Sequence, residues 1–343
     1  MKVGFLHLAC ATSVAAVSAA SAHHSAAAFD LSTEVTVEGT IVELEWKNPH
    51  IYFTIETTGV DGQPLLQQVE VQPISSVQTM GLTKEMLAAG SIVTLRANPS
   101  RRGSGGTLRG LDVTTSDGAI HPLVLTGRSS APPAAEKAVD SLAGRWASSP
   151  AALRIVSREM ATWPVTEAAR TAVEKVRAGA IESQAGCPRY PPPMLDDLPS
   201  VREITIGARE VLIRFDTGGV EAVRTIRLDR ADHPADAEPS LLGHSIGRWD
   251  GETLVVDTVA FAPDARGISA IGIPSGPRKR MTERFVLAED GLSLRRETTL
   301  EDPDYLTAPV SYVMVWDHRP DLEFSSASET CDPEIANRFL EDL

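Results

Sequence analysis

The feature that most limits the possible folds is a series of short segments in which apolar and polar residues alternate. Three of them lie close together, at residues 35–46, 50–56 and 65–72. A period of two residues places successive side chains on opposite faces of a β-strand, so each segment predicts a strand with one buried face. Further strands are expected at residues 91–97 and 108–114. The first part of the chain is therefore predicted to consist mainly of β-strands.

One helix is expected between the third and fourth of these strands, at residues 73–87, where Thr83 is a suitable N-cap. Five short strands with one interposed helix are typical of a small closed barrel of the OB type. A generic β-sandwich would explain the same pattern. We predict an OB-like β-barrel domain over residues 23–125, followed by a linker rich in Ser, Pro and Ala at residues 126–140.

Residues 141–343 are predicted to form a second, larger antiparallel β domain. It contains one amphipathic helix, at residues 166–180, with Thr166 as its N-cap and Gly179 as its stop. The strands expected beyond it are residues 203–206, 210–216, 222–228, 243–249, 253–261, 279–287, 293–301, 311–316 and 323–325. Strands this close in sequence favour antiparallel neighbours, which predicts a lipocalin-like barrel or a curved sheet.

The composition excludes some classes of function. The 343 residues carry a formal net charge of −14, whereas a protein that binds the phosphate backbone of nucleic acids needs clustered Lys and Arg. We therefore expect no nucleic-acid partner.

The beginning of the chain has the order of a secretory signal peptide. Lys2 precedes an apolar stretch, and the small residues Ala20-Ser21-Ala22 follow it. We expect residues 1–22 to be removed, so that a periplasmic or secreted protein without membrane insertion begins at His23. Cleavage after Ala20 and an uncleaved membrane anchor are the alternatives. Removal takes away one lysine and no acidic residue, so the net charge changes from −14 to −15.

Two cysteines, Cys187 and Cys331, remain after this removal. Exported compartments are oxidising, so we expect the two residues to form a disulfide. Two unreactive thiols are the alternative. The absence of a C-x-x-C spacing argues against a cysteine zinc site or a redox motif.

The first domain resembles a known family. The resemblance rests on His23-His24-Ser25, Phe29-Asp30, the segment at residues 35–40, and Trp46-Lys47-Asn48-Pro49-His50. These strings are similar to those of DUF6152, a family of exported bacterial proteins, over about residues 23–125. The segment at residues 243–258 resembles a domain of other exported proteins that has no assigned activity. The resemblance implies an exported, β-rich protein and assigns no catalytic residue.

Three histidines form the sharpest candidate site. If the mature chain begins at His23, the α-amine and the imidazole of that residue can chelate one metal ion, with His24 beside them. His50 follows Pro49, whose fixed φ gives a stiff turn at the barrel rim, and is expected to complete the ligand set. A nitrogen-rich set of this kind favours Cu(II), with zinc second. The residues predicted to orient these ligands are Asp30 and Asn48. The plainer alternative is a frayed terminus and a His50 that only hydrogen-bonds a carbonyl.

A weaker candidate lies in the second domain, where His244, Ser245, Asp250 and Asp257 invite comparison with a hydrolase. Ser245 stands on a predicted strand and lacks the G-x-S-x-G turn of such enzymes. The segment around Asp250 is explained more simply as a hairpin turn.

Three further features are open to more than one interpretation. The basic run Gly276–Arg280 fits an anionic ligand or lipid, or a solvated loop. The Gly144-Arg145-Trp146 triplet is similar to the start of lipocalin-like barrels, which carry apolar molecules. Trp163, Trp249 and Trp316 are expected in the core.

These features together predict an exported binding protein with an N-terminal copper site. The alternatives are a lipocalin-like carrier of a small apolar ligand and an enzyme of unknown reaction.

Overall fold

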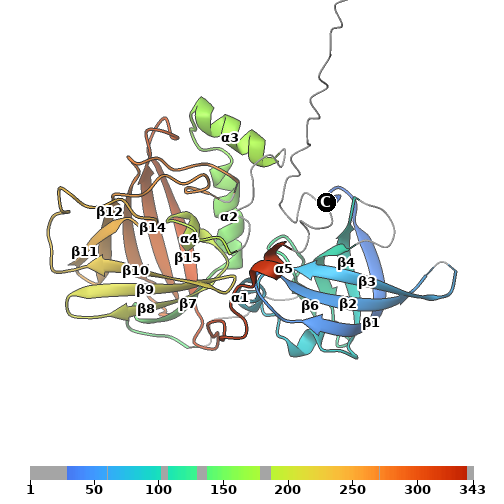
Figure 1. Cartoon of the computed structure of the whole chain (residues 1–343). Coiled ribbons are helices and arrows are strands. Elements are labelled where there is room, and N and C mark those ends of the chain that lie inside the picture. Colours follow the sequence, from blue (N-terminus) through green and yellow to red (C-terminus); the bar gives the residue numbers. More distant parts are fainter. Residues whose placement is uncertain are drawn as a thin grey trace, which may run out of the picture.

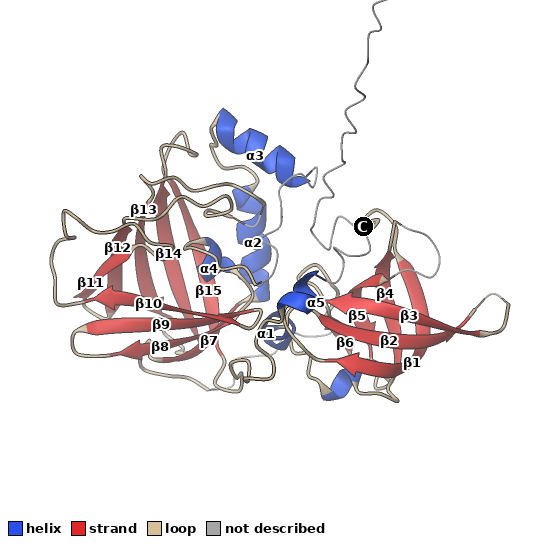
Figure 2. Ribbon diagram, viewed as in Figure 1, coloured by secondary structure: helices blue, strands red, loops and turns tan. Residues whose placement is uncertain are grey.

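The computed structural model describes residues 29–59, 61–101, 107–129, 137–177, 187–269 and 271–337. Two β-barrels lie side by side, with the short helices α1 and α5 near the place where they meet (Figure 1). The mainly β fold with few helices agrees with the alternation in the sequence (Figure 2). Among the described residues, no helix combines the length and the apolar character needed to cross a membrane.

The first barrel has the OB-like topology expected from the sequence. Its strands are β1 (Val35–Glu45), β2 (Ile51–Thr58), β3 (Pro64–Val71), β4 (Ile92–Pro99), β5 (Leu108–Thr114) and the short edge strand β6 (Ile120–Pro122). The order β3-β2-β1-β4-β5-β6 closes into a five-stranded barrel because β3 also pairs with β5 in parallel. The core is apolar and includes Ile41, Ile51, Phe53, Val69 and Leu95.

One prediction in this barrel is wrong in detail. The region expected as a single helix at residues 73–87 contains two short pieces, α1 (Ile74–Thr79) and the 3-10 helix η2 (Glu85–Leu87). Gly81 lies between them with a φ of +90°, a conformation that glycine adopts easily and that a continuous α-helix excludes.

The second barrel contains nine strands. They are β7 (Gly144–Ser148), β8 (Val201–Ile206), β9 (Glu210–Thr217), β10 (Val220–Arg227), β11 (His244–Asp250), β12 (Thr253–Val259), β13 (Arg280–Leu287), β14 (Ser293–Glu301) and β15 (Val310–His318). The barrel closes where the first strand, β7, pairs with the last, β15. The helices of this half are α2 (Pro150–Met160), α3 (Glu167–Arg177), α4 (Met194–Asp197) and α5 (Pro333–Asn337).

The expectation of antiparallel neighbours fails at one pair. β10 and β11 are parallel, with Ile226 opposite Ser245 and Arg227 opposite Ile246. Parallel neighbours require a connection that runs back along the barrel, and residues 228–243 make it. This long connection lies on the outside of the barrel beside β11.

Three local predictions for the second domain need correction. The sequence patterns missed β7 and α2, and residues 323–325 form no strand. Trp316 is buried as expected, whereas Trp249 at the end of β11 is 41 % exposed.

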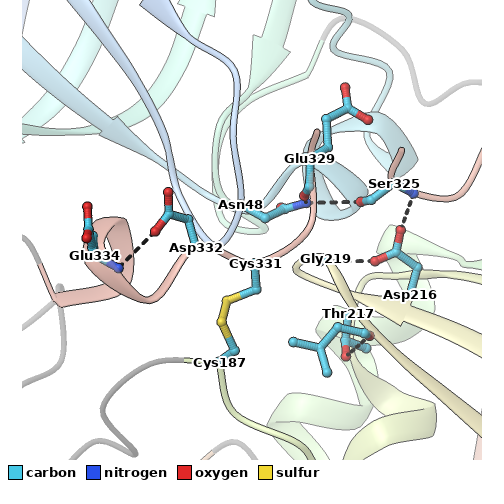
Figure 3. Close-up of a disulfide and its surroundings, with 11 residues drawn as sticks. Asn48, Cys187, Asp216, Thr217, Gly219, Ser325, Glu329, Cys331, Asp332 and Glu334 are labelled. Atoms are coloured by element: carbon cyan, nitrogen blue, oxygen red, sulfur yellow. Dashed lines mark hydrogen bonds between the residues drawn. A yellow bond between two sulfur atoms is a disulfide. The ribbon is translucent and has the colours of Figure 1, made fainter. Parts of the chain in front are cut away.

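The chain returns to the first barrel near its C-terminal end, and this return joins the two barrels (Figure 3). The Asn48 side-chain amide donates to Ser325 Oγ at 3.0 Å and to the Glu329 carbonyl at 2.6 Å. The predicted disulfide is present between Cys187 and Cys331, with 5.8 Å between the Cα atoms. It links the segment before α4 to the segment that lies against Asn48.

Gly219, in the turn between β9 and β10, lies at the same junction. Its φ is +78°, and a Cβ atom there would stand 2.5 Å from the Cys331 nitrogen and 2.8 Å from Asn48 Cβ. The Cys331 N–H donates to the Gly219 carbonyl at 3.1 Å. Only a residue without a side chain allows the two backbones to approach this closely.

Candidate functional site

Of the three predicted metal ligands, His50 is the one that the structure places. His23 and His24 lie outside the described residues. His50 immediately precedes β2, and its side chain is 23 % exposed. Its ring Nδ1 lies 3.2 Å from the Val71 carbonyl oxygen and 3.2 Å from Glu70 Oε1.

The contacts of His50 determine which ring nitrogen carries the proton. A backbone carbonyl and a carboxylate only accept hydrogen bonds, so Nδ1 must be protonated to donate to them. In the neutral imidazole the lone pair then lies on Nε2, which makes no hydrogen bond with a described residue. This is the arrangement in which metal-binding histidines are usually held. Glu70, a neighbour that the sequence pattern did not reveal, is 3 % exposed.

The two residues predicted to orient the ligands have other partners. The Asp30 carboxylate accepts from Ser32 and Thr33, and these hydrogen bonds lower its pKa to about 2. The Asn48 side chain is fully buried, and its Oδ1 accepts from the Ile74 N–H at 3.0 Å. Since its amide nitrogen serves the barrel junction, the described contacts give Asn48 a structural role.

The weaker candidate set does not come together. Successive residues of a strand face opposite sides, so His244 lies outside the second barrel and Ser245 inside it. Ser245 Oγ lies 2.9 Å from Thr258 Oγ1 and accepts from Arg224 Nε at 3.3 Å. Asp250 is at the far end of β11, 3.5 Å from Arg284. A Ser-His-Asp arrangement is therefore absent from these residues.

Inside the second barrel, Ser245 contacts a cluster of buried charges. Its charged members are Arg202, Arg224, Arg296, Asp196, Asp197 and Glu283, each less than about a tenth exposed. Arg224 donates to Glu283 through both terminal nitrogens and to Thr258 Oγ1 at 2.8 Å. Asp196 and Asp197 enter the barrel on α4.

Burial shifts the pKa values in this cluster. It raises the pKa of Asp197 to about 6, although the positive charge of Arg296 opposes the shift. It lowers the pKa of Arg202 to about 9, against the opposing influence of Asp196. The Arg202 guanidinium lies over the Trp316 ring, 4.2 Å from its centroid. The described interior of this barrel is thus strongly polar in one region.

Outside the barrel, His244 and Asp257 are connected because both contact His233, a residue that the sequence pattern did not reveal. His233, in the connection 228–243, places its Nδ1 2.8 Å from Nδ1 of His244 and its Nε2 3.4 Å from Asp257 Oδ2. Arg280 donates to both oxygens of Asp257, at 2.9 and 2.7 Å. Burial, followed by the charge of His233, lowers the pKa of His244.

The basic run Gly276–Arg280 is not a free cationic patch. Arg278 pairs with Asp304 and Arg280 with Asp257. Lys279 is buried, its Nζ donates to the Pro192 carbonyl at 2.7 Å, and burial lowers its pKa to about 7.

A groove of about 770 Å³ lies between the connection 228–243 and the outer surface of β11, β12 and β13. Ile246 and Val255 contribute apolar surface, and Arg230, Arg248 and Trp249 contribute exposed side chains. Its volume is in the range of small-molecule sites.

Within the described ranges, no three His, Cys, Asp or Glu side chains form a group able to hold a metal ion. A comparison with curated proteins found no match. Residues 11–109 match the model of DUF6152, a family of unknown function. The match confirms the resemblance recognised in the first domain; it begins at residue 11 and ends in β5, short of the residue 125 expected from the sequence.

Proposed function

We propose that the protein is an exported metal-binding protein, with copper as the preferred ion and His50 as one ligand. The observation that carries the proposal is the orientation of the His50 ring. Nδ1 faces two acceptors, Glu70 and the Val71 carbonyl, which leaves the Nε2 lone pair available to a metal ion.

Chain length supports the participation of the predicted new N-terminus. Phe29 pairs with Ser100 at the end of β4, so the first barrel holds the chain six residues after His23. The pairings Pro99–Leu108, Leu108–Val69 and Val69–Phe53 place the end of β4 three strand spacings, about 15 Å, from β2, at the level of Phe53. Six extended residues span up to about 20 Å. The proposal therefore requires residues 23–28 to extend from Phe29 toward His50.

The donor chemistry supports copper over zinc. An α-amine and imidazoles are nitrogen ligands, which Cu(II) prefers and binds more tightly than other divalent ions of its series. Glu70 would fix the ring orientation and make the His50 imidazole a better donor.

The test uses protein exported by the cell, because an N-terminal Met would block the chelating amine. Copper affinity is measured by competition with a chromophoric chelator for the native protein and for His50→Ala. His121→Ala is the matched control, since His121 belongs to β6 of the same barrel. We expect His50→Ala to weaken copper binding by at least tenfold and His121→Ala to leave it unchanged.

Two results would contradict the proposal. Equal copper retention by His50→Ala would exclude His50 as a ligand. A mature chain that begins at Ser21 or Ser25, found by N-terminal sequencing, would exclude the amine chelate. Glu70→Gln provides a finer test, because loss of an orienting partner lowers metal affinity by about 10 to 100 times.

A further inference from the structure

The groove beside β11 combines three properties of a ligand site. It is concave, it has apolar surface from Ile246 and Val255, and it has an exposed indole, Trp249. Flat aromatic side chains that remain exposed at the wall of a groove are suited to stacking on a ligand.

The charges that line the groove are not balanced. Its two acidic residues already have partners, since Asp257 pairs with Arg280 and Asp229 pairs with Arg209. Arg230 and Arg248 are exposed and form no ion pair with a described residue. Two uncompensated guanidinium groups on one groove create a local attraction for an anion, although the chain as a whole carries a net charge of −14.

The topology explains why a groove exists here. Because β10 and β11 are parallel, the connection 228–243 must run along the outside of the barrel. His233 holds this connection against His244 and Asp257. The connection therefore forms a fixed wall opposite the strands.

We propose that this groove binds a small amphipathic anion, an apolar or aromatic molecule that carries one carboxylate, sulfonate or phosphate group. The anionic group pairs with Arg230 and Arg248, and the apolar body lies over Val255 against Trp249. This site is independent of the metal site proposed for the first barrel.

The test uses 8-anilinonaphthalene-1-sulfonate, an aromatic sulfonate whose fluorescence increases on binding, and its uncharged relative N-phenyl-1-naphthylamine. The variants are Arg230→Glu, Arg248→Glu and Trp249→Ala in the full chain. Arg295→Glu is the matched control, because Arg295 is an exposed arginine on β14 outside the groove. Arg248→Gln replaces Arg248→Glu if the latter fails to show the native near-ultraviolet circular dichroism.

We expect the native protein to bind one sulfonate probe per chain. Arg230→Glu and Arg248→Glu should each weaken its binding by about tenfold, the effect of losing one charge-assisted contact. Arg295→Glu should change the affinity by less than twofold, and Trp249→Ala should weaken binding of both probes. The proposal is overturned if the native protein binds no sulfonate probe below millimolar concentration. It is equally overturned if the Arg230 and Arg248 variants bind the probe as well as Arg295→Glu does.

Discussion

The two barrels solve the same closure problem with different interiors. Five strands enclose a space that apolar side chains such as Ile55 and Leu95 occupy. Nine strands enclose a wider space, which holds an apolar core that includes Phe215, Phe285 and Trp316 and also a cluster of buried charges. In the second barrel, α4 enters this space and brings Asp196 and Asp197, which Arg296 and the neighbouring arginines compensate.

This difference predicts two kinds of sensitivity. An apolar interior responds to lost volume, because each removed methylene leaves a small cavity. An interior that contains paired charges responds to lost charge balance even when volume is kept, because the partner is left buried and unpaired. Of four measurements of unfolding, the comparison of Glu283→Gln with Ile55→Val and the pH dependence separate these two sensitivities.

The largest effect is expected from removal of the disulfide. Cys187 and Cys331 are 144 residues apart, and the chain-entropy model assigns about 5 kcal/mol to a loop of this length. The double variant Cys187→Ser/Cys331→Ser should lower the unfolding free energy of the second barrel by this order, since the bond restrains the segment that leads to α4. Denaturant unfolding followed by circular dichroism measures the change. A loss below about 1 kcal/mol would show that contacts other than the disulfide hold α4.

The next largest effect is expected at Glu283. Glu283→Gln keeps the volume but removes the charge that compensates Arg224, and breaking a buried pair typically costs about 3–5 kcal/mol. The comparison in the first barrel is Ile55→Val, which removes one methylene and should cost about 1 kcal/mol.

A second variant distinguishes charge imbalance from general damage. Arg224→Met with Glu283→Leu removes both charges and should recover much of the stability lost in Glu283→Gln. If the double variant is less stable than Glu283→Gln, the ion pair between Arg224 and Glu283 is itself stabilising, and the loss in Glu283→Gln does not come from an unpaired charge alone.

The barrel junction provides the third measurement. Gly219→Ala should cost about 3–4 kcal/mol, because the residue has a positive φ and the new Cβ meets the Cys331 nitrogen. Gly251→Ala is the matched control, since its φ is +62° and nothing lies within 4 Å of the new atom. The control should cost about 1 kcal/mol from backbone strain. Equal losses for both variants would mean that the close approach at the junction adds nothing.

The smallest expected effect is a pH dependence with opposite signs in the two barrels. Burial raises the pKa of Asp197 from 3.8 to about 6. At a pH between these two values, Asp197 keeps its proton in the native state and has lost it in the unfolded chain. Its contribution to stability therefore decreases by about 2–3 kcal/mol as the pH rises from 4 to 7. In the first barrel, burial raises the pKa of Asp112. Hydrogen bonds from Arg128 and Arg96 outweigh this effect and lower the pKa of Asp112 below 3.8. That contribution is present at neutral pH and is lost in acid.

These signs are tested by subtracting the unfolding free energy of Asp197→Asn, and of Asp112→Asn, from that of the native protein at each pH from 3 to 7. The Asp197 difference should fall with rising pH and the Asp112 difference should rise. Two flat differences would refute both assignments.

Two kinds of feature were predictable from the sequence: strands that show a local alternation, and a disulfide for which only one pairing of cysteines was possible. Alternation located most strands, and β14 begins and ends where it was expected, at Ser293 and Glu301. The disulfide was predictable because only two cysteines remained to pair, Cys187 and Cys331.

Features that depend on distant contacts were missed. β7 has five residues, too few to show alternation, and is held by β8 and β15. The parallel pairing of β10 with β11 has no local signal, so neither His233 beside His244 nor the groove was foreseen. Asn48 was expected beside a metal ligand because it is near His50 in sequence, yet its side chain faces residues 325–329.

The pairing of β7 with β15 also sets an order for the growing polypeptide. The first strand of the second barrel leaves the ribosome long before Val310–His318, the strand that must lie beside it. Until then β7 keeps one unpaired edge, and such an edge is open to pairing with another chain. Cys331 and its contacts with Asn48 and Gly219 are synthesised later still. The first barrel can close as soon as its own strands have been made, whereas the second closes, and the two join, only after Val310–His318 and Cys331 have been synthesised.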